Sequence, residues 1–230
     1  MLHGIDEYEK FKVIRPIPDN HSSDCFGMPV IKNNININLE AHKIISILNL
    51  NCRKSYKNFI ATGFNYDYRL NKFWNDPLKY IPTLQKAGVC CTPDYSIYPS
   101  MSFWEIAHNT YRNRWLGCLW QTYGIPVICT ISWATPETYN ICFSGVEQGN
   151  VVAISTLGCT TTNRQAFLAG YREMMIRIKP SLVIVFGKFI NGIYGRVLHF
   201  EYEDLVNHNN GITEQSLFVF PRILDIEEVC

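Results

Sequence analysis

The feature that most constrains the fold of this chain is a rhythm of short apolar runs, each ending in polar residues and followed by an amphipathic stretch. The runs are residues 58–65 (NFIATGFN), 88–94 (GVCCTPD), 125–133 (IPVICTISW), 150–156 (NVVAIST) and 181–187 (SLVIVFG). Their spacing is that of a βα unit, which predicts a parallel sheet flanked by helices. Because parallel sheets place ligands just beyond the carboxyl ends of their strands, functional residues are expected where these runs end.

Segments with helical spacing lie between the runs. The spacing of apolar residues predicts the strongest helix over residues 102–123. It predicts a second helix over residues 162–179 that ends before Pro180. Residues 70–87 contain Pro77 and Pro82, which favours two short helices over one. A further short helix is expected within residues 39–50, where apolar residues fall near helical spacing.

The fold class that follows is a single α/β domain with a mainly parallel sheet flanked by helices. An open Rossmann-like sheet is favoured, because a complete barrel typically needs about 250 residues and this chain has 230. An incomplete TIM-like barrel is the alternative. Residues 1–57 are expected to form an irregular N-terminal segment that packs on the core, and residues 58–230 the α/β domain.

The rhythm breaks after residue 187, where Asn191-Gly192 and Gly195 are turn residues. Too few residues follow for a crossover helix. Residues 197–202 are therefore predicted to be a strand paired antiparallel near an edge of the sheet. A last strand is expected over residues 217–220.

Charge and cysteine content exclude several functional classes. The formal net charge is +1, too balanced for the broad positive field of a generic nucleic-acid or acidic-membrane binder. No signal segment and no run of about 18 apolar residues occurs, so we expect a cytoplasmic protein without a membrane partner. The nine cysteines include no C-x-x-C pair, which leaves a zinc site unsupported and favours buried free thiols.

Several motifs in one order carry a family resemblance across about residues 55 to 190. They are YDYR (66–69), FWNDP (73–77), PDYS (93–96), YRNR (111–114), WQ (120–121) and STLGC (155–159). In these motifs the chain resembles an uncharacterised domain family carried by bacteriophages and mobile elements. The resemblance implies a mobile-element context and brings no established activity or cofactor with it.

Two carboxylates form the first candidate constellation. Asp67 follows one predicted strand and Asp94 ends the next. If those strands are neighbours, about 5 Å apart, the two carboxyl groups meet at one edge of the sheet. One could be neutral while the other stays charged, as acid/base catalysis requires, or the pair could hold a hard cation. Helix capping and turn formation are the structural alternative for both residues.

Candidate ligand-binding residues surround the same predicted edge. Aromatic rings there could stack on a base or a sugar, or they could simply pack in the core. The turn after residue 154 is rich in hydroxyls and could hold a phosphate at a helix N-terminus, although helix capping explains it equally well and no P-loop spacing is present. Arginine and lysine side chains could bind an anion, or they could be solvated or paired with an acid such as Glu105. The candidate ligand-binding residues are Tyr66, Arg69, Tyr95, Ser96, Arg112, Arg114, Trp133, Ser155, Thr156, Gly158 and Lys188.

The expected function combines the mobile-element context with this chemistry. The leading hypothesis is an accessory protein that binds or processes a nucleotide or another phosphorylated small molecule at the carboxyl ends of the strands and thereby counters host defence. One alternative is a protein that binds and inhibits a host defence factor and has no ligand site. Another is a hydrolase that acts on a nucleoside or sugar through Asp67 and Asp94. A cysteine nucleophile at Cys91 or Cys159 is less favoured, because no histidine occupies an identifiable partner position.

Overall fold

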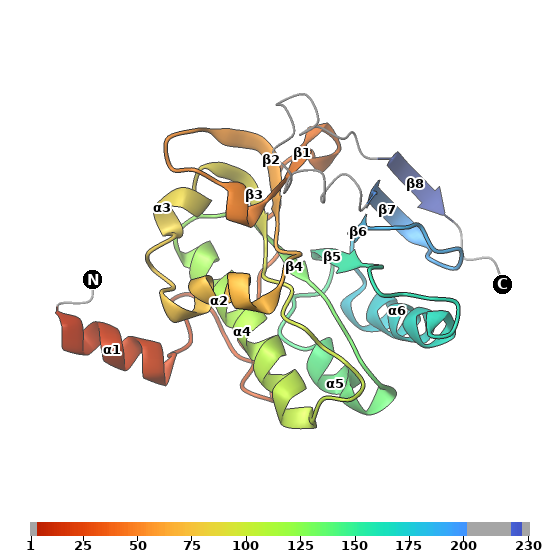
Figure 1. The fold of residues 1–230 in the computed structure, drawn as a ribbon, viewed down its shortest axis with the longest axis horizontal. Helices are drawn as coiled ribbons and strands as arrows, with labels where there is room; N and C mark the ends of the chain where they lie inside the picture. Colours follow the sequence, from red (N-terminus) through yellow and green to blue (C-terminus); the bar gives the residue numbers. More distant parts are fainter. Residues whose placement is uncertain (1–3, 202–221, 227–230) are drawn as a thin grey trace.

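A curled sheet with helices on one side forms the body of the molecule (Figure 1). The computed structural model describes residues 4–201 and 222–226. The sheet has eight strands in the order of the chain. The strands are β1 Lys43–Ser46, β2 Tyr56–Thr62, β3 Ala87–Cys91, β4 Val127–Thr130, β5 Val151–Ser155, β6 Leu182–Phe186, β7 Gly195–Phe200 and β8 Arg222–Ile226.

Strands β1 to β7 run parallel, each beside the strand that follows it in the chain. Only β8 is antiparallel, against β7. Helix α1 Ile5–Ile14 and the 3-10 turn η1 Leu39–Ala41 precede the first strand. The helices between the strands are α2 Asp67–Asn75, α3 Ile81–Leu84, α4 Phe103–Thr122, α5 Tyr139–Cys142 and α6 Arg164–Ile178. Two further 3-10 turns are η2 Ile47–Asn49 and η3 Pro136–Thr138.

Both faces of the sheet are buried at its central strands, which explains why strands such as β4, β5 and β6 are nearly continuous apolar runs. Successive side chains of a strand point to opposite faces of the sheet, so neighbouring residues belong to two different apolar clusters. Ile45 and Cys90 pack on the outer face with side chains of the helices such as Trp115. Their neighbours Ile44 and Cys91 face the inner side. A single layer of helices therefore covers the outer face, and the inner face forms a second apolar layer.

The sheet curls enough to bring its two ends together at one point. Arg196 at the start of β7 donates a hydrogen bond of 2.6 Å to Glu40, which precedes β1. The sequential strand order carries no reversal. This half-barrel is a single α/β domain, as the sequence predicts, and it fits both the open-sheet and the incomplete-barrel descriptions.

The five apolar runs are confirmed as β2 to β6, and the helices expected within residues 70–87, 102–123 and 162–179 are confirmed as α2 with α3, α4 and α6. The five cysteines in or beside these elements are buried free thiols, also as expected: Cys90, Cys91, Cys118, Cys129 and Cys142.

One prediction of secondary structure is wrong, and another is incomplete. Residues 39–50 form no single helix but contain β1 between two 3-10 turns, because Ile44 and Ile45 are buried on opposite faces of the sheet. The strand expected over residues 197–202 is present as β7 and pairs antiparallel with β8 near the edge of the sheet, as expected, but it also pairs parallel with β6, which was not expected. No helix is needed, because eight extended linking residues can reach about 27 Å, further than the length of β6. The strand expected over residues 217–220 lies outside the described residues.

The segment before residue 58 contributes regular structure to the domain. It supplies β1 to the sheet and α1, whose end is held on the helix layer by Arg15. The Arg15 guanidinium lies 4.2 Å from the ring centre of Trp74 and 4.9 Å from that of Trp115. Such cation–π contacts stabilise a buried arginine that has no ion pair with a carboxylate among residues 4–201.

Candidate functional site

The Asp67 carboxylate joins the start of α2 to the segment that follows β3. Asp67 is the first residue of α2 and comes shortly after β2 ends. Its Oδ1 accepts hydrogen bonds from the backbone N–H of Ser96 at 3.1 Å and from the Ser96 hydroxyl at 2.9 Å. A carboxylate in the first helical turn is also favoured by the helix dipole. Asp67 and Ser96, both expected in the site, are thus brought into contact.

Arg112 lies beside this pair on the buried side of α4. Its Nη2 is 3.9 Å from Asp67 Oδ2, and its Nη1 and Nη2 donate to Asn71 at 2.8 Å and to Asn109 at 2.7 Å. The guanidinium carbon lies 3.7 Å from the centre of the Tyr95 ring. Burial lowers the pKa of Arg112, and Tyr95 and Asp67 oppose that effect. The ion-pair partner is Asp67 rather than Glu105.

Asp94 occupies a different environment, just after β3. Its backbone N–H donates to the Gly63 carbonyl at 3.0 Å, which joins the ends of β2 and β3. The Ser132 hydroxyl donates to Asp94 Oδ1 at 2.6 Å. Burial raises the pKa of Asp94 from 3.8 to about 6, against the lowering effect of Ser132 and with a smaller rise from Asp67. A carboxyl group with this pKa can donate or accept a proton near neutral pH.

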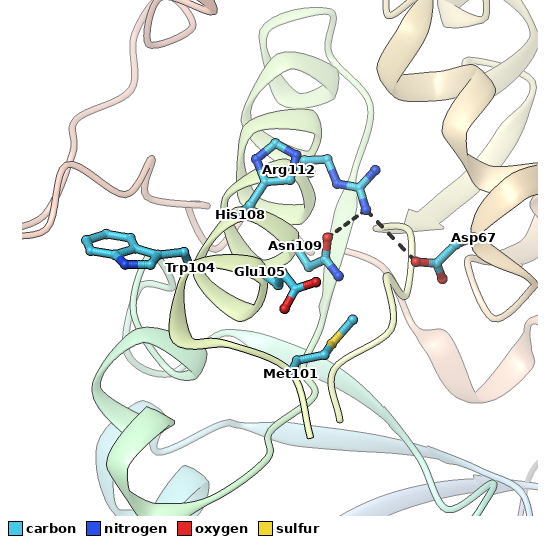
Figure 2. Close-up of a pocket in the computed structure, with 7 residues that line it drawn as sticks. All are labelled: Asp67, Met101, Trp104, Glu105, His108, Asn109 and Arg112. Carbon is cyan, nitrogen blue, oxygen red and sulfur yellow. Dashed lines mark hydrogen bonds and ion pairs between the residues drawn. The ribbon is translucent and has the colours of Figure 1, made fainter. Parts of the chain in front are cut away.

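An open pocket of about 460 Å³ lies between the starts of α2 and α4 (Figure 2). Asp67, Asn109 and Arg112 lie together on one side of it, and the indole of Trp104 extends from α4 on the other. The remaining lining residues are Met101, Glu105 and His108. Asp94 does not line this pocket. It borders a separate cavity of about 10 Å³ shared with Ser132 and Arg114, which has room for about one water molecule.

Arg114 is placed as a structural side chain. It is 2% exposed and donates to the carbonyls of Ser144 at 2.9 Å and Cys142 at 2.7 Å and to the Asn113 side chain at 2.7 Å. These bonds tie α4 to the segment around α5. The donors of its guanidinium are therefore largely used within the protein.

Trp133 and Tyr66 differ in their surroundings. Trp133 packs against Phe143 and Phe167, with ring centres 5.9 and 5.0 Å apart, and it lies against Gly170 of α6. Tyr66 is 72% exposed and stacks on Tyr68 at 5.9 Å. Both follow strand ends, but only Tyr66 is open to a ligand to any large extent.

A second group of predicted residues lies at the ends of β5 and β6. The buried Thr156 hydroxyl donates to the Lys188 carbonyl at 2.8 Å, and the Ser155 hydroxyl accepts from the Leu157 N–H at 3.1 Å. Gly158 has a φ of +80°, which permits the turn. The Ser155 hydroxyl thus binds within the turn, the Thr156 hydroxyl ties the turn to the segment that follows β6, and the Lys188 side chain is exposed.

Several site residues were missed by the sequence analysis. Asn109 and Asn71 hold Arg112, Ser132 holds Asp94, and Trp104 and His108 line the pocket. The sequence of α4 contains a weak signal for Asn109, because the polar residues 109, 112 and 113 recur at helical spacing on the face that is buried. Ser132 had a clearer one, since it lies near the end of the predicted run 125–133, as Asp94 lies at the end of the run 88–94.

The described part of the chain shows neither a metal-binding cluster nor a membrane-spanning helix. Over residues 4–201 and 222–226, no three or more histidine, cysteine or acidic side chains are grouped so that they could hold a metal ion. Within the same ranges, no helix has the length and apolar character needed to cross a membrane.

Comparison with known proteins gives one family and two phage relatives. The family described as "Domain of unknown function (DUF4417)" matches residues 20–203. The "Gene 1 protein" of Mycobacterium phage D29 is 38% identical over 124 residues, 53% of this chain and 46% of that protein. Its namesake from Mycobacterium phage L5 is 37% identical over 124 residues, 53% of this chain and 54% of that protein. The chain spans about half the length of these curated relatives. No solved structure matches.

Proposed function

This chain belongs to the DUF4417 family, a phage-associated domain of unknown function, and from that premise we propose that it binds or processes a nucleotide or another phosphorylated ligand at the carboxyl ends of its strands. In this proposal the protein acts in the host cytoplasm and counters host antiviral defence by removing or altering a signalling molecule. The same strand ends would carry the reaction if the ligand is turned over.

The observation that carries the proposal is the presence of two carboxyl groups in different surroundings, Asp94 and Asp67, after the ends of neighbouring parallel strands. Burial raises the pKa of Asp94 to about 6, whereas Asp67 faces Arg112 and accepts hydrogen bonds from Ser96. Two carboxyl groups with such different surroundings are suited to separate acid and base roles. Asp94 would protonate the departing oxygen of an ester or glycosidic bond, a water molecule would supply the hydroxyl group, and Asp67 would act as the base that takes the proton released by that water.

Groups suited to the rest of such a ligand lie on the same edge of the molecule. The exposed ring of Tyr66 offers a stacking surface for a base. Exposed Lys188 and partly exposed Arg69 can contribute charge to a phosphate. These contacts support a phosphorylated ligand, with Asp94 and Ser132 near the reacting bond.

Thermal shift with a panel of nucleotides and cyclic nucleotides tests ligand binding. At about 1 mM ligand we expect at least one member to raise the melting temperature of the wild type, because a ligand that binds only the folded state stabilises it. The Asp94→Asn variant should keep this shift and lose turnover of that ligand. Absence of a shift across the whole panel would count against the proposal, and turnover that survives in both Asp94→Asn and Asp67→Asn would remove the catalytic role.

A hydrolase that acts on an unphosphorylated nucleoside or sugar is the second candidate, favoured by the same raised pKa of Asp94. Chromatography of nucleosides and glycosides incubated with the protein separates the two. Release of a free base or sugar, lost in Asp94→Asn, would favour this candidate over a phosphorylated ligand.

A further inference from the structure

Large aromatic side chains are exposed at and just before the starts of α2 and α4, close in sequence to residues that line the pocket of Figure 2, and Trp104 is itself one of the lining residues. The five residues, called here the aromatic surface, are Tyr66 (72% exposed), Tyr68 (75%), Tyr98 (58%), Phe103 (42%) and Trp104 (78%). Single exposed apolar residues are ordinary, but exposed aromatic rings gathered at one place are typical of interaction sites. Tyrosine, tryptophan and phenylalanine are also the residues enriched at protein interfaces.

The rings are held in pairs on the two sides of the pocket. Tyr66 and Tyr68, which flank Asp67, stack with ring centres 5.9 Å apart. Phe103 and Trp104, which begin α4, lie edge to face at 5.4 Å. Such pairing restricts the rings before a partner arrives, and preorganisation lowers the entropic cost of binding.

The pocket between the two pairs carries more negative than positive charge. Asp67 and Glu105 supply two carboxylates. The guanidinium of Arg112 is 9% exposed and is directed to Asp67, Asn71 and Asn109. Burial and the nearby Arg112 lower the pKa of His108, so its imidazole is neutral at pH 7. The Ser102 N–H and hydroxyl each donate to one Glu105 oxygen at 2.8 Å, which keeps this carboxylate charged at the pocket mouth.

Because paired aromatic rings lie beside a pocket with more negative than positive charge, we propose that the aromatic surface is a docking site for a protein partner. This partner would insert a lysine or arginine side chain into the pocket. The cation would lie on the face of the Trp104 indole and pair with Glu105, a combination of cation–π and charge contacts. The paired rings would pack on apolar side chains beside the inserted residue. Carboxylates at this position oppose a phosphate backbone, which favours a protein over a single-stranded nucleic acid.

This inference extends beyond the proposed ligand function, and although the two share Tyr66 and Asp67, the residues that would hold the cation differ from the proposed acid. Asp94 does not line the pocket, and Trp104 and Glu105 take no part in the proposed acid/base chemistry. The two proposals can therefore fail separately.

A random peptide library screened against the immobilised full chain tests the docking site. We expect the selected peptides to share a lysine or arginine, and replacement of that residue by glutamine to weaken binding about tenfold. Trp104→Ala should weaken binding of the same peptides by about three- to tenfold, the range that a cation–π contact supports. Glu105→Gln should weaken it as well, while keeping the acceptor that caps α4.

Two variants serve as matched controls. Tyr123→Ala removes an exposed ring at the opposite end of α4, and Asp94→Asn removes the proposed acid; both should bind the peptides as the wild type does. Circular dichroism of each variant establishes that it is folded.

The docking proposal is overturned if the library yields no binder, if the selected peptides share no basic residue, or if Trp104→Ala binds them with unchanged affinity. It is equally overturned if a single-stranded oligonucleotide binds the wild type and loses affinity in Trp104→Ala. None of these results bears on nucleotide-induced stabilisation or on the role of Asp94.

Discussion

At Asp94 burial and hydrogen bonding act in opposite directions on one carboxyl group. Burial raises its pKa from 3.8 to about 6, and the bond from Ser132 limits that rise. Between about pH 4 and pH 6 the folded state therefore binds more protons than the unfolded state, so the free energy of unfolding falls as the pH rises through this range. Above pH 6 the protein bears the full cost of the buried charge.

Asp94→Asn removes that cost without a large change of shape. We expect the free energy of unfolding to increase by on the order of 1–3 kcal/mol at pH 7 and to change little at pH 4. Urea denaturation at the two pH values measures the difference. Asp19→Asn, at an exposed position, is the control and should show no such pH dependence. Equal effects of Asp94→Asn at both pH values would contradict the assigned cause.

Gly170 shows how one residue without a side chain can position an aromatic ring. A Cβ atom at this position would lie 2.1 Å from Nε1 of Trp133. Alanine is the better helix former by about 1 kcal/mol, but we expect the clash to dominate and Gly170→Ala to lower the free energy of unfolding by about 1–3 kcal/mol. In a Trp133→Ala background the same change should become stabilising. Thermal denaturation of the four proteins tests this, and stabilisation in the native background would contradict it.

At the scale of the element, α4 depends on a capping box at its first turn. The Ser102 hydroxyl accepts from the Glu105 N–H at 3.3 Å, and Glu105 accepts from the Ser102 N–H at 2.8 Å. Ser102→Ala should lower the free energy of unfolding by about 1 kcal/mol. Ser100→Ala, an exposed position in the same loop, should have little effect. Comparable losses in the two variants would argue against the cap.

Strands were predictable from the sequence because both faces of the sheet are buried, so that a strand such as Leu182–Phe186 is apolar throughout. Short strands are harder to identify, because the two isoleucines of β1 are too few to separate a period of 2 from one of 3.6. The parallel pairing of β7 with β6 could not be predicted for another reason. A parallel return without a helix depends on the reach of the loop, which no local pattern encodes.

The candidate site also contains residues that the sequence predicts and residues that it does not. Its carboxylates were predictable because Asp67 and Asp94 directly follow recognisable strands. The contacts that give the two carboxylates different surroundings were not predictable. Arg112 and Ser132 come from other parts of the chain and reach Asp67 and Asp94 only in the folded protein. Sequence spacing places a residue at a strand end, but it does not reveal which side chain donates to it.

At the scale of the whole molecule, the sheet begins before residue 58. Strand β1 pairs along β2 from Lys43 to Ser46, and Ile44 and Ile45 are buried. A fragment of residues 58–230 would lose this strand and expose the apolar edge of β2, so we expect it to aggregate or to lack a cooperative unfolding transition. Gel filtration and thermal denaturation measure this. A monomeric fragment with the stability of the full chain would show that residues 1–57 are dispensable for folding.

The proposed function depends most directly on the protonation of Asp94. An NMR titration that follows the side-chain carboxyl carbon of Asp94 in the full chain measures it residue by residue. We predict a midpoint near pH 6 in the wild type and a lower one in Asp67→Asn, because the neighbouring carboxylate raises the pKa of Asp94. A midpoint near pH 4 in both proteins would show that Asp94 is an ordinary carboxylate and would contradict its assignment as the acid/base group of the site.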